Sequence, residues 1–213
     1  MKKILILFSI SLLFSFNNEV KAQDPAFSQF FANPLYLNPA MAGTNICPRI
    51  SLNHRNQWPG IGKTYVTYSA SYDQYVEKLG GGLGFAIAKD VAGAGNLNTT
   101  HISAAYAYRL KINKKLSINA GFEAAYRQLG IDWQNLTFGD MIDPVQGFIY
   151  PTNEDIVNYA NSKGFTDFAA GFMGFGNANN QFDYYFGFAA HHITMPDQGF
   201  IGESRLPMKV TAN

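Results

Sequence analysis

The sequence predicts an all-β protein, an antiparallel transmembrane β-barrel of outer-membrane type. Three observations support this fold class. From about residue 49, bulky apolar residues alternate with small or polar ones along successive segments, a pattern typical of strands with one apolar face. The opposite face consists mostly of Gly, Ala, Ser and Asn. The connections between segments alternate between short and long, as they do in transmembrane barrels.

The alternation recurs in five segments and weakens in one. In the segment 165–175, Phe168 and Phe172 fall on the face opposite Phe165, Met173 and Phe175. The clearest bulky faces are formed by Val66, Tyr68, Ala70 and Tyr72; by Leu83, Phe85 and Ile87; by Ile102, Ala104, Tyr106, Tyr108 and Leu110; by Leu116, Ile118, Ala120, Phe122, Ala124 and Tyr126; and by Phe182, Tyr184, Phe186 and Phe188.

A soluble β-sandwich could use the same strands with the bulky face turned inward. The barrel is favoured because the small-residue face carries only isolated charges, and because several segments exceed the ~10 residues that cross a bilayer. Short turns are expected at 75–81, 111–114 and 177–180, and long loops at 130–163 and 193–205. With the first strand rising from the periplasm, the long loops face outward. A last strand cut short at residue 213 predicts an incomplete, N-terminal portion of a larger barrel.

The first 22 residues have the pattern of a secretory signal peptide. Lys2 and Lys3 precede an apolar run over 4–16, and a small-residue cleavage site ends at Ala22. The alternative, an uncleaved anchor, is disfavoured because the run is shorter than the ~20 residues of a spanning helix. We therefore expect a signal peptide over 1–22, a proline-interrupted periplasmic or plug segment over 23–48, and barrel strands over 49–213.

Composition excludes several classes of protein. Without the leader the chain carries 13 basic and 14 acidic side chains, which gives no reason to expect nucleic acid as a partner. Cys47 is the single cysteine, so neither a disulfide framework nor a zinc cluster is expected. We expect its thiol to be buried.

The segment 23–44 is rich in aromatic residues and interrupted by Pro25, Pro34 and Pro39. Prolines at this spacing exclude both a regular helix and a central strand. Asn33 and Asn38, each followed by proline, favour turns or extended structure. An apolar segment without regular structure has to pack on another part of the protein.

The side chains that could carry chemistry do not form a convincing site. His54 and His101 lie far apart, and the neighbours His191 and His192 should point to opposite faces of a strand, so no metal site is expected. The acidic loop 130–164 leaves calcium binding open, with a solvated acidic loop as the alternative. Ser103 shares a strand face with His101, but so do alternate residues on any strand, and catalysis is not expected.

Two charges on the small-residue face suggest a packing interaction. Glu123 and Arg127 lie about 13 Å apart on one predicted strand, so each should pair with a neighbouring strand. Arg109 is a candidate partner for Glu123.

The segment after the leader, together with Arg55, Asn56, Gln57 and Trp58, resembles the start of the PorP/SprF family of outer-membrane proteins. That family serves the type IX secretion system of Bacteroidota. The most specific matching residues are Asn33, Pro34, Leu37, Asn38, Pro39, Ala40, Gly43 and Thr44. The resemblance implies a non-enzymatic outer-membrane component without a cofactor, which assists the export or surface attachment of secreted proteins such as gliding adhesins.

The resemblance also implies partners. They are the periplasmic ring lipoproteins of the translocon, a secreted surface adhesin, and outer-membrane lipid. Partner docking is expected through Phe27, Phe30, Phe31 and Tyr36 and the motif residues, with simple packing against the barrel as the alternative. A passive porin remains the alternative function, because a Gly/Ala/Ser face could line a water channel.

Overall fold

A computed structural model describes residues 24–25, 27, 29–45, 47–61, 65–93, 97–113, 116–154, 156, 159–177 and 183–213. The predicted signal peptide, 1–22, lies outside them. The main sheet contains β1 (Arg49–Gln57), β2 (Tyr65–Val76), β3 (Gly81–Ala92), β4 (Leu97–Lys111), β5 (Leu116–Gly130), β8 (Ser162–Asn177), β9 (Asp183–His191) and β10 (Lys209–Ala212).

The shorter elements lie before, between and after these strands. The N-terminal part forms η1 (Phe30–Ala32), α2 (Pro34–Leu37) and η2 (Pro39–Met41). Single turns η3 (Pro59–Ile61) and η4 (Glu77–Leu79) follow β1 and β2. The connection from β5 to β8 contains η5 (Trp133–Asn135), η6 (Gly139–Met141) and a hairpin of β6 (Ile142–Asp143) and β7 (Gly147–Phe148).

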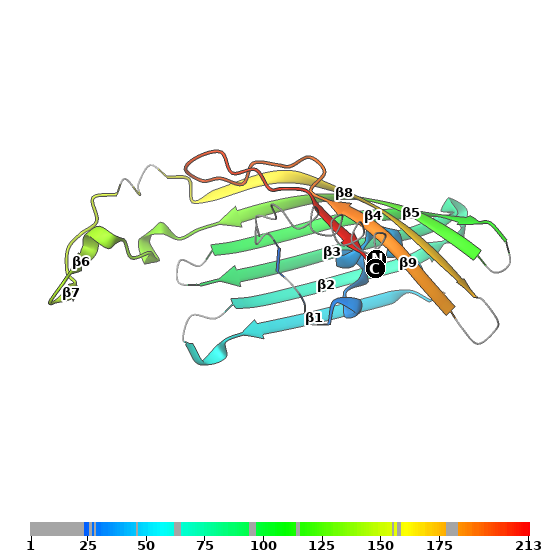
Figure 1. Cartoon of the computed structure of the whole chain (residues 1–213), viewed down its shortest axis with the longest axis horizontal. Coiled ribbons are helices and arrows are strands. Elements are labelled where there is room, and N and C mark those ends of the chain that lie inside the picture. The colour runs from blue at the N-terminus through cyan, green and yellow to red at the C-terminus, as the bar shows by residue number, and fades with distance from the viewer. Residues whose placement is uncertain are drawn as a thin grey trace, which may run out of the picture.

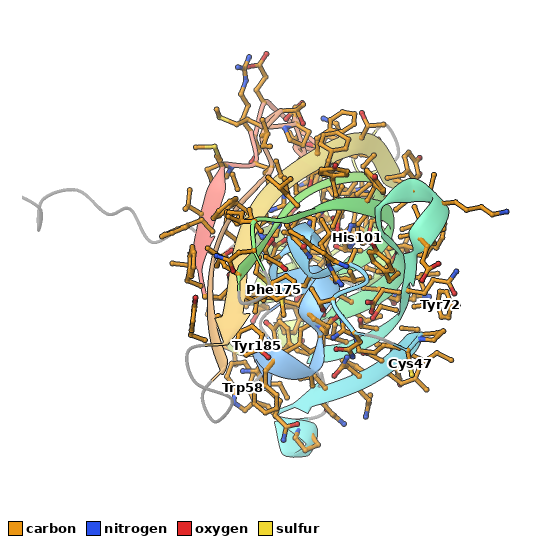
Figure 2. The ribbon with its side chains drawn as sticks, turned by 90° about the vertical axis from the view of Figure 1, so that its right-hand side faces the viewer. Cys47, Trp58, Tyr72, His101, Phe175 and Tyr185 are labelled. Carbon is orange, nitrogen blue, oxygen red and sulfur yellow. The ribbon has the colours of Figure 1, made fainter. Side chains whose placement is uncertain are left out.

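The eight strands form a single antiparallel meander in the order β1-β2-β3-β4-β5-β8-β9-β10. The sheet curls into a half-barrel, and its concave face encloses the N-terminal residues (Figure 2). One curled sheet, instead of two packed sheets, confirms the predicted all-β barrel class. Among the described residues, β1 and β10 are the two edges and do not pair with each other. In the same part of the chain, no helix is long and apolar enough to cross a membrane.

Side chains divide between the two faces as the alternation predicts. On β4, Ile102 and Tyr108 are 52% and 51% exposed, whereas Ala105 and Ala107 are 5% and 0% exposed. The buried residues face the concave side and pack with Leu35 and Ala42 of the N-terminal part. The bulky face therefore points outward, toward the position of lipid in a membrane barrel.

The connections also follow the prediction, with one difference. Figure 1 shows the last residues of β2, β4 and β8 at one end of the sheet, and the long connections from β5 to β8 and from β9 to β10 at the other. The connections 58–64 and 93–96, at the long-loop end, are nevertheless short. The difference in connection length between the two ends of the sheet therefore comes from two long loops, because the other connections at that end are short.

The prediction that Cys47 is buried is wrong. Cys47 is exposed, because the chain has left the concave face at this point and has not yet entered β1. It lies at the short-turn end of the sheet, since the neighbouring Arg49 pairs with Asp73 near the end of β2. Figure 2 shows it on the side that faces the viewer.

The outward orientation of the bulky face predicts a depth-dependent cost of charge. Phe122 lies near the middle of β5 and Gln128 near its end, and both point outward. Phe122→Arg should lower the free energy of unfolding in lipid by ~2–4 kcal/mol, and Gln128→Arg by ~0–1 kcal/mol. Denaturant titration in vesicles measures both. Equal effects of the two substitutions would contradict the assignment of the outer face to lipid.

Candidate functional site

The candidate site is the N-terminal segment, defined here as residues 24–44, which lies against the concave face of the sheet (Figure 2). Pro34 and Pro39 begin α2 and η2 at first-turn positions, where the missing N–H costs no hydrogen bond. The segment therefore forms short turns joined at Asn33 and Asn38, as the proline spacing predicts.

Buried asparagines connect the segment to the sheet. Asn38 is fully buried, and its Nδ2 donates to the carbonyl oxygens of Phe172 at 3.2 Å and Phe188 at 3.4 Å. Its Oδ1 accepts from the backbone N–H of Ala40 at 2.9 Å. Asn33 Nδ2 donates to Ser69 Oγ at 3.0 Å. The side chains of Asn33 and Asn38 thus provide hydrogen-bond partners for buried polar groups that would be costly to leave unpaired.

Glycines of the concave face make room for the segment. A Cβ at Gly121 would meet the backbone of Ala40, and one at Gly82 would meet the carbonyl of Ala42. A Cβ at Gly84 would lie 2.9 Å from Leu35 Cδ1. At Gly82 and Gly121 the backbone of the segment approaches so closely that a side chain would require the backbone to move, whereas at Gly84 the Leu35 side chain would have to shift. The sequence predicts small residues inside the barrel, and the structure shows that they leave space for the chain's own N-terminal part.

A group of charged residues holds the start of the segment. Asp24 contacts Arg127 Nη1 at 2.8 Å, His192 Nε2 at 3.0 Å and Lys209 Nζ at 3.1 Å. Asp167 contacts His192 Nδ1 at 2.6 Å and Arg127 Nε at 3.2 Å. Mutual pairing offsets the large cost of burying each of these charges. The pairing of Arg127 with neighbouring β8 follows the prediction, whereas the contact with Asp24 could not be foreseen.

The prediction that His191 and His192 point to opposite faces is wrong. Both are buried on the concave side, and His191 Nε2 lies 3.3 Å from the carbonyl oxygen of Leu37. β9 ends at His191, and His192 has a φ of 57°. This left-handed backbone conformation ends the alternation and turns the His192 ring back toward Asp24 and Asp167.

The other end of the segment is fixed at Gly43. Its N–H donates to Asp73 Oδ2 at 2.8 Å, and its carbonyl accepts from Arg109 Nη2 at 2.5 Å. Asp73 also pairs with Arg49 at 2.8 Å. Arg109 lies over the rings of Tyr75 and Phe175. The predicted pairing of Arg109 with Glu123 is therefore wrong, because Arg109 binds the N-terminal segment instead.

Glu123 lies in a second buried polar group on β4 and β5. Its Oε1 is 3.8 Å from His101 Nε2, and Ser103 on β4 is also buried. A nucleophilic serine would need a base that accepts its proton and is itself oriented by an acid. Here His101 Nε2 makes no hydrogen bond within the part of the chain that the structure describes, so this nitrogen does not accept a proton from Ser103. Among the described residues, no cluster of three or more His, Cys, Asp or Glu could hold a metal ion.

The predicted aromatic residues of the segment differ in their environments. Phe27 packs edge-on against Tyr36 with ring centroids 5.4 Å apart, and Tyr36 Oη donates to the Pro25 carbonyl at 2.8 Å. Phe31 is 68% exposed. The side chain of Phe30 lies outside the described residues. The most deeply buried apolar residues of the segment are Leu35, Ala40 and Ala42. Ala40 is a motif residue, whereas sequence reasoning missed Leu35 and Ala42.

The second part of the motif lies on edge strand β1 and not beside the first. Arg55 Nη2 donates to Gln57 Oε1 at 2.8 Å, whereas Asn56 points to the outer face. Trp58 is exposed, has a φ of 57° and packs edge-on against Tyr65 at 5.5 Å. A hydrogen bond between neighbours of the two motif parts connects β1 to the N-terminal segment. Asn53 Nδ2 donates to the carbonyl oxygen of Ala32 at 3.3 Å.

The two long loops contact each other at the far end of the sheet. Trp133 and Phe200 pack edge-on at 6.1 Å, and Lys163 pairs with Asp197 at 2.6 Å. The bond from Lys163 and the backbone N–H groups of Ser204 and Gly199 hold the pKa of Asp197 well below its usual range. This contact therefore contributes to loop order at neutral pH, and it is lost only when strong acid protonates the carboxylate.

The glycine contacts predict a local requirement for small residues. Gly121→Ala would place a methyl group against Ala40, and it should cost about 1–3 kcal/mol of stability. Gly139→Ala is the matched control, because no other group lies within 4 Å of its Cβ position. Thermal unfolding in detergent and protease cleavage within 24–44 measure the effect. Equal behaviour of the two variants would show that the segment does not lie against β5.

Comparisons with known proteins identify a family. The family model described as type IX secretion system membrane protein PorP/SprF matches residues 19–213. No curated protein and no solved structure matches the chain.

Proposed function

Because the chain belongs to the PorP/SprF family of type IX secretion system membrane proteins, we propose that it is a non-enzymatic outer-membrane component. In this role it assists the export or surface attachment of secreted proteins such as gliding adhesins. The outward-facing apolar side chains of the half-barrel support a membrane location. The predicted cleaved signal peptide would export it across the inner membrane, from where a barrel can enter the outer membrane.

The observation that carries this proposal is the filled concave face. A passive porin needs a polar, water-filled lumen. Here Leu35, Asn38, Ala40 and Ala42, all fully or nearly fully buried, occupy the face that would line such a channel. This arrangement favours an accessory or scaffold role over the alternative of solute passage.

We propose that other secretion components, including the periplasmic ring lipoproteins, and a secreted adhesin are the partners. Asn33, Pro34, Asn38 and Pro39 are buried in contacts with the sheet, so their role is to position the segment. Phe31, in the same segment, is 68% exposed, and we propose that this exposed ring contributes to docking.

Phe31→Ser should weaken the affinity for the ring lipoproteins about tenfold or more, and so reduce their recovery in a pull-down, without changing thermal stability, because a docked phenyl ring contributes ~1.5–3 kcal/mol. Ile201→Ser, on a long loop and equally exposed, is the matched control. If the Phe31→Ser variant recovered the ring lipoproteins fully, Phe31 would have no part in docking, and the segment would serve only to pack against the sheet.

Deletion of the gene tests the function itself. The proposal predicts loss of one or more secreted proteins from the cell surface, with outer-membrane permeability to small solutes unchanged. Surface proteomics and a dye-uptake assay on the deletion strain measure the two quantities. Solute flux through purified protein in liposomes, combined with normal surface proteins after deletion, would establish the porin alternative instead.

A further inference from the structure

The hairpin of β6 and β7 projects beyond the sheet at its long-loop end (Figure 1). We use the term loop hairpin for residues 140–152. Its side chains include several large apolar groups with high exposure. Val145 at the tip is 91% exposed and Phe148 is 60% exposed, and Ile142, Ile149 and Tyr150 are each about half exposed. Such a concentration of apolar surface on a projecting element marks an interaction site more often than a solvated loop.

The loop hairpin is held in one shape by its own hydrogen bonds. Asp143 Oδ1 accepts from the N–H groups of Val145 at 2.8 Å and Gln146 at 2.9 Å, and its Oδ2 accepts from Tyr150 Oη at 3.0 Å. Gly147, with a φ of 82°, completes the turn. Asp143 accepts all three bonds, which also lower the pKa of its carboxyl group. A partner that binds Val145 therefore meets a pre-ordered turn, which reduces the entropic cost of association.

The base of the loop hairpin is ordered in the same way. Asp140 accepts from Thr152 Oγ1 at 3.1 Å and from the N–H of Asn153 at 2.6 Å. The Met141 carbonyl accepts from Ile149 N at 3.0 Å. Hydrogen bonds to the carboxylates of Asp140 and Asp143 therefore fix the backbone that carries the exposed apolar side chains.

All charged side chains in the connection from β5 to β8 are acidic. Residues 131–161 contain no Lys or Arg, and their acidic residues are Asp132, Asp140, Asp143, Glu154 and Asp155. Anionic lipid headgroups would repel such a loop, since segments that bind membrane surfaces carry Lys and Arg beside their apolar residues. A basic protein surface would attract it.

We propose that the loop hairpin docks a second protein, whose surface offers an apolar pocket for Val145 and Phe148 within a rim of Lys and Arg. The inference rests on the proposed function for its orientation, with the long loops outside the cell. The partner is thus an exported or surface protein with this chemistry, and the contact is additional to the N-terminal segment.

Orientation is measured separately from docking. Gln146→Cys should react with a membrane-impermeant maleimide in intact cells, whereas Cys47, at the opposite end of the sheet, should react only after permeabilisation. Absence of labelling at position 146 would reject the proposed orientation. That result would overturn the inference through its premise, independently of the binding experiment.

Docking is tested with the full chain in detergent and two synthetic peptides. One peptide has Leu and Phe on one face and Lys on the other, and its twin has Glu in place of Lys. The Lys peptide should bind, and the double variant Val145→Ser/Phe148→Ser should weaken binding by about tenfold or more. Ile201→Ser should leave it unchanged, and the Glu twin should bind at least tenfold more weakly. Equal binding of the twins, or of the double variant and the parent chain, would overturn the proposal.

A photo-crosslinker at Val145 in living cells identifies the occupant. The proposal predicts a protein adduct that disappears with Phe148→Ser and decreases with Glu154→Lys, whereas a crosslinker at Tyr185, at the short-turn end, does not yield it. An adduct of lipid mass at Val145 would show that the loop hairpin contacts the membrane, and would overturn the proposal. So would the absence of any adduct.

Discussion

The close approach of the N-terminal segment to the concave face is the constraint on which the rest of the structure depends. The backbone of Ala40 lies where a side chain on Gly121 would be, and the Ala42 carbonyl lies where one on Gly82 would be. Small residues on these strands are therefore required by a packed neighbour, and bulky residues must point outward. The composition of the chain, rich in both glycine and aromatics, follows from this division between two faces.

The segment also connects parts of the sheet that are not neighbours. Asn33 binds Ser69 on β2, whereas Asn38 binds carbonyl groups on β8 and β9. The Leu37 carbonyl accepts a hydrogen bond from Thr211 on β10. Strand twist gives an open sheet part of its curvature. The contacts of the N-terminal segment with β2 and with β8, β9 and β10 add to this by holding the two halves of the sheet around the segment. The buried ion pairs of Asp24 add a charge requirement to this geometry, so that the start of the segment has one favourable position.

Local pattern was enough to predict much of this fold. The alternation of Ile102, Tyr106 and Tyr108 with Ala105 and Ala107 predicted both the strand and its two faces, because a pleated strand has a strict period of two. The prolines predicted an irregular N-terminal segment for an equally local reason. The family resemblance was carried by the same segment, and its asparagines now have a physical role in positioning it.

The predictions failed where the decisive contact was distant in sequence or depended on one backbone angle. Arg109 was expected to bind Glu123 on the next strand, yet it binds Gly43, 66 residues away. His192 was placed on the wrong face because its positive φ is not visible in the residue pattern. The burial of Leu35 and Ala42 against the sheet was not predicted, because it depends on contacts with strands distant in sequence. Periodicity describes a strand, but it does not describe what packs against it.

For the proposed role in secretion, the half-barrel with its filled concave face would act as a support that presents the long loops at one end. The most direct test of this account is amide hydrogen exchange of the chain in detergent, followed by mass spectrometry of the peptide spanning 33–43. The account predicts slow exchange, comparable with that of β4 and β5, because the amides of Leu37, Asn38, Ala40, Met41, Ala42 and Gly43 donate hydrogen bonds. Exchange as fast as that of the exposed turn around Val145 would contradict it, since the segment would then not occupy the concave face.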